Sequence, residues 1–155
     1  MTNNRSVGLI YRNVYLFKLT MWLLYRSAYL KKYKSVVDEI EPGSLVVDLC
    51  CGACRTAPLL LAKGCKYIGL DINPRFVKWA CEKGYDVRLW DARKMEFPKG
   101  DVICIQSALY HFIPNDRALV EKMLSRAKRK VIITEPVPDL GFDTKSPFAR
   151  FVRWM

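Results

Sequence analysis

Apolar residues along the chain follow two rhythms. From about residue 9 to residue 40 they recur every three or four positions without an interior Gly or Pro, which predicts one long helix. The dipeptide Pro42-Gly43 then ends the helix, and short apolar strands alternate with helix-length segments. We expect strands at 45–49, 67–71, 86–90, 102–106 and 131–135, and helices at 55–63, 74–83 and 116–127. Such alternation is typical of a parallel sheet with helices on both faces.

These elements predict an α/β fold, a doubly wound and mostly parallel sheet with an N-terminal helical cap. Residues 1–40 would form the cap and residues 41–155 the core. No final antiparallel hairpin is visible after the fifth strand, so two interpretations stand. Either the core is C-terminally truncated, or the fifth strand is an exposed edge that another copy covers in a homodimer. In both cases ligands would bind beyond the carboxyl ends of the strands.

Composition indicates the cellular compartment and the kinds of partner. The 155 residues suffice for one hydrophobic core, and the six cysteines follow no secretory signal, which predicts a cytoplasmic protein with free thiols. No apolar run reaches the ~20 residues that cross a bilayer. The formal net charge of +11 attracts anionic partners, a membrane surface or RNA among them. Basic patches at 31–34 and 126–130 are either anion-binding sites or solvated helix faces.

Acidic, small or polar residues end the expected strands and begin the loops after them. They are Asp48, Cys50, Gly52, Asp71, Ile72, Asp91, Ala92, Gln106 and Ser107. In this order they resemble the motifs of class I (Rossmann-like) S-adenosylmethionine-dependent methyltransferases of the small-molecule type, and the likeness covers most of residues 41–138. Helix capping or a solvated strand end would explain any one of the three Asp residues. It does not explain all three.

The resemblance implies a Rossmann-like sheet, S-adenosylmethionine as the cofactor, and methyl transfer to a small-molecule acceptor. All nine residues would belong to the cofactor site. Asp71 would accept hydrogen bonds from the ribose hydroxyls, and Asp91 would lie against the adenine amino group. Asp48 would lie near the methionine end of the cofactor, and the backbone around Gln106 and Ser107 would face it.

Catalysis and acceptor binding rest on fewer signals. In methyl transfer the protein chiefly aligns the acceptor and, for some acceptors, removes its proton. His111, the one histidine, is the candidate base, with Tyr110 and Glu135 as weaker alternatives. A histidine in this place also packs as an ordinary residue after the fourth strand. Three aromatic residues are candidate acceptor contacts or ordinary core of the cap, namely Tyr11, Tyr15 and Trp22.

The loop after the first strand departs from the family pattern, because Cys50 and Cys54 stand where glycines are usual. A left-handed backbone is costly at such residues. Cys51 and Cys54 also resemble a thioredoxin-like dithiol, which would be a redox site. No second Cys/His cluster completes a metal site, so none is expected. Further alternatives are a noncatalytic S-adenosylmethionine-binding partner subunit and an RNA methyltransferase.

Overall fold

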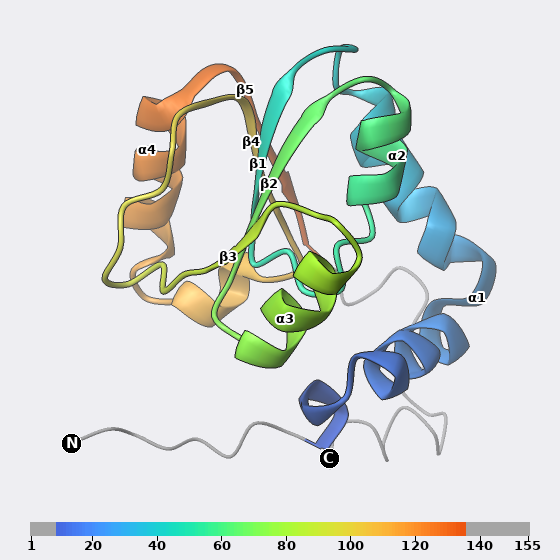
Figure 1. The fold of residues 1–155 in the computed structure, drawn as a ribbon. Helices are drawn as coiled ribbons and strands as arrows, with labels where there is room; N and C mark the ends of the chain where they lie inside the picture. The colour runs from blue at the N-terminus through green and yellow to red at the C-terminus, as the bar shows by residue number, and fades with distance from the viewer. Residues whose placement is uncertain (1–8, 136–155) are drawn as a thin grey trace.

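The computed structural model describes residues 9–135 of the chain (Figure 1). In chain order the elements are η1 (Leu9–Arg12), α1 (Val14–Asp38), β1 (Leu45–Leu49), α2 (Ala57–Ala62), β2 (Lys66–Asp71), α3 (Pro74–Glu82), β3 (Val87–Leu89), β4 (Gly100–Gln106), η2 (Leu109–Phe112), α4 (Asp116–Arg126) and β5 (Ala127–Thr134). Each expected helix and strand is present. The prediction about a hairpin after the fifth strand concerns residues 136–155, which lie outside the described residues.

One five-stranded sheet organises the fold. Its strands run parallel in the order β3-β2-β1-β4-β5. Helix α4 covers one face, while α2, α3 and the C-terminal end of α1 pack against the other (Figure 1). The structure thus confirms the predicted doubly wound, Rossmann-like α/β fold. Strand β5 lies at one edge of this sheet, and a homodimer formed through that edge stays a prediction.

The central strand β1 is buried on both faces, as a strand between two helical layers must be. Val46 belongs to the core beneath α1 and α2, and Val47 and Leu49 belong to the core beneath α4. Strand order reverses at β1, because β2 follows on one side and β4 on the other. The carboxyl ends of β1 and β4 are therefore where a ligand binds in open sheets of this kind.

Helix α1 spans two environments. It begins at an N-cap, Asn13, whose side-chain oxygen accepts hydrogen bonds from N–H groups of the first turn. Its C-terminal end lies in the core, where Val36 and Leu60 of α2 share one cluster. Its N-terminal half extends past the carboxyl ends of the strands (Figure 1), and there Phe17 packs against Phe76 of α3. Among the described residues, no helix is both long enough and apolar enough to cross a membrane.

Strand β5 begins earlier than expected, at Ala127 instead of residue 131. Three consecutive basic residues, Lys128–Lys130, predicted the end of a helix, but pairing with β4 holds them in a strand. Acidic groups lie beside them: Lys128 is 3.8 Å from Asp101 and Lys130 is 3.0 Å from Glu39. Most of this basic patch therefore belongs to an edge strand and not to a helix.

Candidate cofactor and acceptor site

The loop between β1 and α2 turns through three residues with left-handed backbone. Their φ angles are 56° at Cys50, 52° at Gly52 and 49° at Cys54. Only the middle residue is glycine, and each cysteine carries a cost of about 1–2 kcal/mol for this conformation. Hydrogen bonds hold the loop in place, because Cys51 N–H donates to the Leu70 carbonyl at 3.1 Å. The cysteines therefore keep a glycine-like backbone course at some cost in stability.

Asp71 ends β2 and faces this loop. One carboxylate oxygen accepts from Gly52 N–H at 2.7 Å and the other from Asn73 N–H at 2.8 Å. The residue is only 8% exposed, and burial raises its pKa even though these backbone donors act to lower it. A carboxylate can accept about four hydrogen bonds, so acceptor capacity remains for a hydroxyl group. Ile72, the next residue, exposes its side chain.

Asp48 is sealed inside the protein at 2% exposure. Its carboxylate accepts hydrogen bonds from Thr56 Oγ1 at 2.8 Å, Tyr67 Oη at 3.0 Å and Cys104 Sγ at 3.4 Å. Burial raises its pKa, and these donors partly offset the rise. Asp48 thus ties β1 to α2, β2 and β4, and a direct contact with a cofactor stays a prediction.

Asp91 follows β3, on the same edge of the sheet as Asp71. The two are brought together because Trp90 N–H donates to the Asp71 carbonyl at 2.8 Å. The Asp91 carboxylate accepts from Arg93 N–H at 3.0 Å and is 24% exposed. Ala92 is half-buried against the core beneath α4. Asp91 stands where the third acidic residue was expected, and Ala92 follows it. The role of both residues beside an adenine ring stays a prediction.

The end of β4 gathers polar groups from three distant segments. Ser107 has a left-handed φ of 51°, and its hydroxyl accepts a hydrogen bond from the Lys32 ammonium of α1. Burial lowers the Lys32 pKa, and the nearby Glu135 carboxylate opposes the decrease. Gln106 Oε1 is buried without a hydrogen-bond partner among the described residues, as is Thr134 Oγ1. Sequence reasoning missed Lys32, because its contact with Ser107 spans 75 positions.

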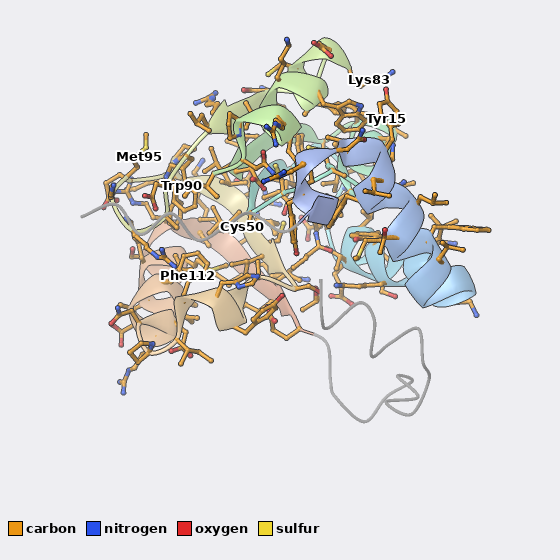
Figure 2. All side chains as sticks on the ribbon, turned by 90° about the horizontal axis from the view of Figure 1, so that it is seen from below. Tyr15, Cys50, Lys83, Trp90, Met95 and Phe112 are labelled. Atoms are coloured by element: carbon orange, nitrogen blue, oxygen red, sulfur yellow. The ribbon has the colours of Figure 1, made fainter. Side chains whose placement is uncertain are left out.

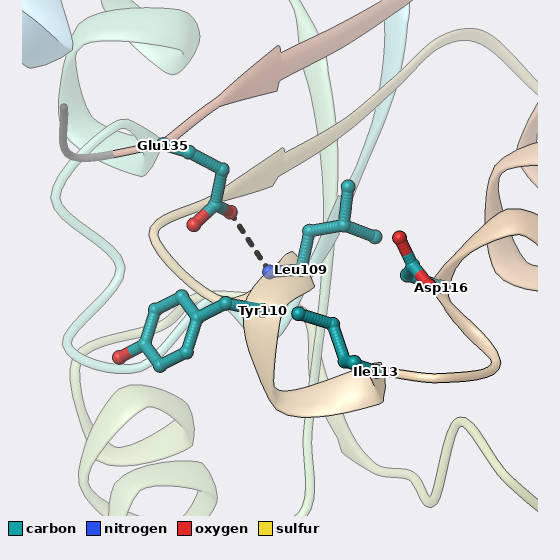
Figure 3. Close-up of a pocket in the computed structure, with 5 residues that line it drawn as sticks. All are labelled: Leu109, Tyr110, Ile113, Asp116 and Glu135. Carbon is teal, nitrogen blue, oxygen red and sulfur yellow. Dashed lines mark hydrogen bonds between the residues drawn. The ribbon is translucent and has the colours of Figure 1, made fainter.

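Glu135, the residue after β5, contacts the segment that follows β4. Its Oε1 atom accepts hydrogen bonds from Ala108 N–H at 3.0 Å and from Leu109 N–H at 2.8 Å, at the start of η2. A pocket of about 420 Å³ opens beside it between η2, α4 and the end of β5 (Figure 3). The lining residues are Leu109, Tyr110, Ile113, Asp116 and Glu135.

Of the two candidate catalytic residues, Tyr110 lines this pocket and His111 lies against Tyr110. Tyr110 is half exposed, and its ring centroid is 4.0 Å from that of His111. Partial burial lowers the His111 pKa, Glu135 acts in the opposite direction, and Arg93 lowers it further. His111 is therefore more readily neutral than a free histidine, as a base requires, while its role in catalysis stays a prediction.

Of the three N-terminal aromatic residues, Tyr11 lies nearest the candidate site. Its carbonyl accepts from Asn73 Nδ2 at 3.0 Å, and its ring packs 5.5 Å from that of Phe17. Burial and the charge of Asp71 raise its pKa. Tyr15 and Trp22 are exposed on α1, and Figure 2 shows Tyr15 well apart from Cys50. Acceptor contact by any of the three stays a prediction.

The dithiol interpretation meets physical objections. The sulfur atoms of Cys51 and Cys54 lie 3.7 Å apart, but the hydrogen bond between them and burial raise the Cys51 pKa well above that of a free thiol. Burial also raises the Cys50 pKa to about 12. Dithiol redox chemistry needs a stabilised thiolate, which this loop disfavours. Within residues 9–135, no group of three or more His, Cys, Asp or Glu side chains could hold a metal ion.

Residues 46–131 match the methyltransferase domain family, and the chain belongs to it. It is a class I methyltransferase domain, whose cofactor is S-adenosylmethionine. No curated protein matches the chain. The Asp71 and loop geometry fits that cofactor, because one carboxylate with spare acceptor capacity faces a loop of small residues.

Solved structures share the fold at low identity. The magnesium protoporphyrin IX methyltransferase of Synechocystis PCC 6803, with bound S-adenosylmethionine, has a TM-score of 0.66 and 22% identity over 85% of this chain and 70% of its own. A possible histamine N-methyltransferase of Thermotoga maritima has a TM-score of 0.62 and 20% identity, over 80% of this chain and 58% of its own. The sugar N-methyltransferase KedS8 of Streptoalloteichus sp. ATCC 53650 has a TM-score of 0.59 and 19% identity, over 76% of this chain and 51% of its own. The chain thus spans little more than half the length of the latter two.

Proposed function

We propose that this chain transfers a methyl group from S-adenosylmethionine to a small-molecule acceptor that carries an amino group. The family match supports methyl transfer, and the open pocket beside η2 offers a place for the acceptor. Its volume of about 420 Å³ lies within the range of small-molecule sites, and it adjoins the segment after β4, next to the expected methionine end of the cofactor. The cofactor supplies an activated methyl group on a sulfonium, so the protein mainly has to bind and align its partners.

Cofactor binding would use the carboxyl edge of the sheet. Asp71 would accept the ribose hydroxyls, and the backbone at Gly52 would approach the cofactor without a side chain in the way. Lys32 would pair with the carboxylate of the methionine portion, because its ammonium already reaches Ser107 at the end of β4. A half-buried ammonium gains more from such a pair than an exposed one would.

Acceptor chemistry follows from the pocket lining. Leu109 and Ile113 provide apolar surface, Tyr110 an aromatic ring, and Asp116 and Glu135 two carboxylates. Carboxylates accept hydrogen bonds from N–H groups, and an aromatic face attracts a cation, so this lining suits an amine. Among the similar structures, one is named a sugar N-methyltransferase and another a possible histamine N-methyltransferase.

An amine attacks only through a free electron pair, so a protonated acceptor must first lose a proton. We assign this step to His111, with Tyr110 orienting it, because the His111 pKa is lowered and its ring lies against Tyr110. The N-terminal elements η1 and α1 would act as the cap that closes the site, since Tyr11 of η1 is hydrogen-bonded to Asn73 beside Asp71.

Calorimetry with S-adenosylmethionine and S-adenosylhomocysteine, followed by turnover against acceptor pools, tests the proposal. We expect micromolar binding and release of S-adenosylhomocysteine with amine pools, and none with phenol or carboxylic acid pools. Binding without turnover on any pool would replace the enzyme by a noncatalytic partner subunit. Turnover on RNA, with steep loss of binding as salt rises, would make it an RNA methyltransferase.

A further inference from the structure

Large apolar side chains form an exposed face on α1. Five of them are between 43% and 65% exposed, namely Tyr15, Leu16, Leu19, Trp22 and Leu23. At 3.6 residues per turn they fall within an arc of about 120° and extend over about 12 Å of helix. We call this set the α1 apolar face. Monomeric soluble proteins rarely leave so much contiguous apolar surface in water, which marks it as an interaction surface.

The rest of the same helix segment is packed. Val14 and Phe17 contact Phe76 of α3 in a small core cluster, and Thr20 is buried with its hydroxyl bonded to the Leu16 carbonyl. The segment is therefore attached to the domain by one side and exposed on the other. The α1 apolar face is the side of this segment that points away from the domain.

Charge identifies the kind of partner. Residues 1–37 contain seven Lys or Arg and not one Asp or Glu, whereas the whole chain has 26 Lys or Arg and 15 Asp or Glu. Arg12 precedes the α1 apolar face and Lys31 and Lys34 follow it, and all three are exposed. Two copies of this positive segment would repel each other if they packed face to face, while a negatively charged surface would attract each of them.

We propose that the α1 apolar face binds the surface of an anionic lipid bilayer. The leucines would enter the boundary between headgroups and acyl chains, and the basic residues would pair with lipid phosphates. Trp22 and Tyr15 suit that boundary, where aromatic rings with a polar edge accumulate. The helix would lie on the bilayer without crossing it. This inference rests on α1 alone and holds whether or not the proposed acceptor class is right.

Co-sedimentation of the full chain with vesicles tests it. The two vesicle types are phosphatidylcholine alone and phosphatidylcholine with one third phosphatidylglycerol. We expect binding to the anionic vesicles at low salt, weakening as salt rises, with a blue shift of tryptophan emission that disappears in Trp22→Phe. Leu19→Glu with Leu23→Glu should weaken binding at least about tenfold, since it removes apolar contact and adds repulsion.

The matched control is Leu124→Glu, which places the same charge at an exposed leucine on α4 and should leave binding unchanged. Circular dichroism and the melting temperature establish that each variant folds, and Leu19→Ser with Leu23→Ser replaces the Glu pair if it does not. Absence of binding to anionic vesicles at low salt overturns the proposal. So does equal binding by the double variant and wild type. A concentration-dependent dimer abolished by the same double variant, without vesicle binding, would assign the face to a second copy.

Discussion

The carboxylate of Asp71 accepts a 2.7 Å hydrogen bond from the backbone N–H of Gly52, 19 positions earlier in the chain. The end of β2 thereby fixes the loop after β1, and one buried acidic group serves both the shape of the loop and its expected ligand. Any change at Asp71 should therefore appear in two measurements, one of stability and one of cofactor affinity.

Replacing Asp71 by Asn should weaken S-adenosylhomocysteine binding at least about tenfold and lower the free energy of unfolding by about 1 kcal/mol, because one acceptor oxygen becomes a donor. Calorimetry and urea unfolding measure the two effects. Asp86→Asn is the control, since Asp86 is exposed and pairs with Arg88. Unchanged affinity in a folded Asp71→Asn protein would remove Asp71 from the cofactor site.

The left-handed backbone at Cys50 predicts an unusual order of stability. Cys50→Gly and Cys50→Ala both delete the thiol, but only alanine keeps a β-carbon at a φ of 56°. The glycine variant should be more stable than the alanine variant by about 1 kcal/mol, opposite to the order found in helices and strands. Urea midpoints of the two proteins decide the matter, and an alanine variant that equals or exceeds the glycine variant would show that the loop stores no strain here.

His111 can be titrated without ambiguity, because the chain has one histidine. NMR should give a pKa below the usual 6.5, and Glu135→Gln should lower it further, since the carboxylate favours the charged ring. With the folded pKa depressed, the unfolded chain binds the proton more tightly, so stability contributed by this group is lost as pH falls below 6.5. Methyl transfer should fall over the same range, and His111→Gln should remove that acid limb. An acid limb that persists in His111→Gln would exclude the assigned base.

Lys32 is expected to recognise one part of the cofactor only. Lys32→Gln should weaken S-adenosylhomocysteine binding about tenfold, whereas binding of methylthioadenosine, which lacks the carboxylate, should not change. Lys32→Arg should restore part of the loss, as it keeps the charge. Equal losses for both ligands would mean that Lys32 acts by holding Ser107 and the end of β4, and not by contact with the carboxylate.

The loop thiols should be inert. Because burial and mutual hydrogen bonding raise the Cys51 pKa, a disulfide reagent at neutral pH should modify exposed Cys81 long before Cys51 or Cys54. Cys51→Ser should keep cofactor affinity within about threefold, as a smaller side chain meets no new obstacle. Rapid modification of Cys51, or loss of turnover in Cys51→Ser, would revive a chemical role for this thiol.

Much of this fold could be predicted from the sequence because its cause is local. The apolar runs that form β1, β2 and β4 are bounded by Gly, Pro and Asp, and the strand-terminal acids lie at one edge simply because parallel strands end there. For the same reason Asp71 and Asp91 could be expected to meet. The early start of β5 could not be predicted, since its basic residues favour a helix end until pairing with β4 decides otherwise.

Long-range packing accounts for what the sequence could not supply. Lys32 reaches Ser107 only because α1 crosses from α2 to the carboxyl edge, and no spacing rule encodes that path. Asp48 was expected beside the cofactor, and its enclosure by Thr56, Tyr67 and Cys104 depends on side chains from three other segments. The sequence predicts where the site lies, and tertiary contacts show which of its residues are enclosed by other side chains.

The α1 apolar face and Lys32 belong to the same helix, α1, which bends between its N-terminal and C-terminal parts (Figure 1). Because Phe17 packs the N-terminal part of this helix against Phe76 of α3, a bilayer that holds the α1 apolar face would also set the side of the domain that faces the lipid. Acceptors dissolved in the membrane would then arrive by lateral diffusion in two dimensions, and their surface density would govern the rate of methylation more than their concentration in water.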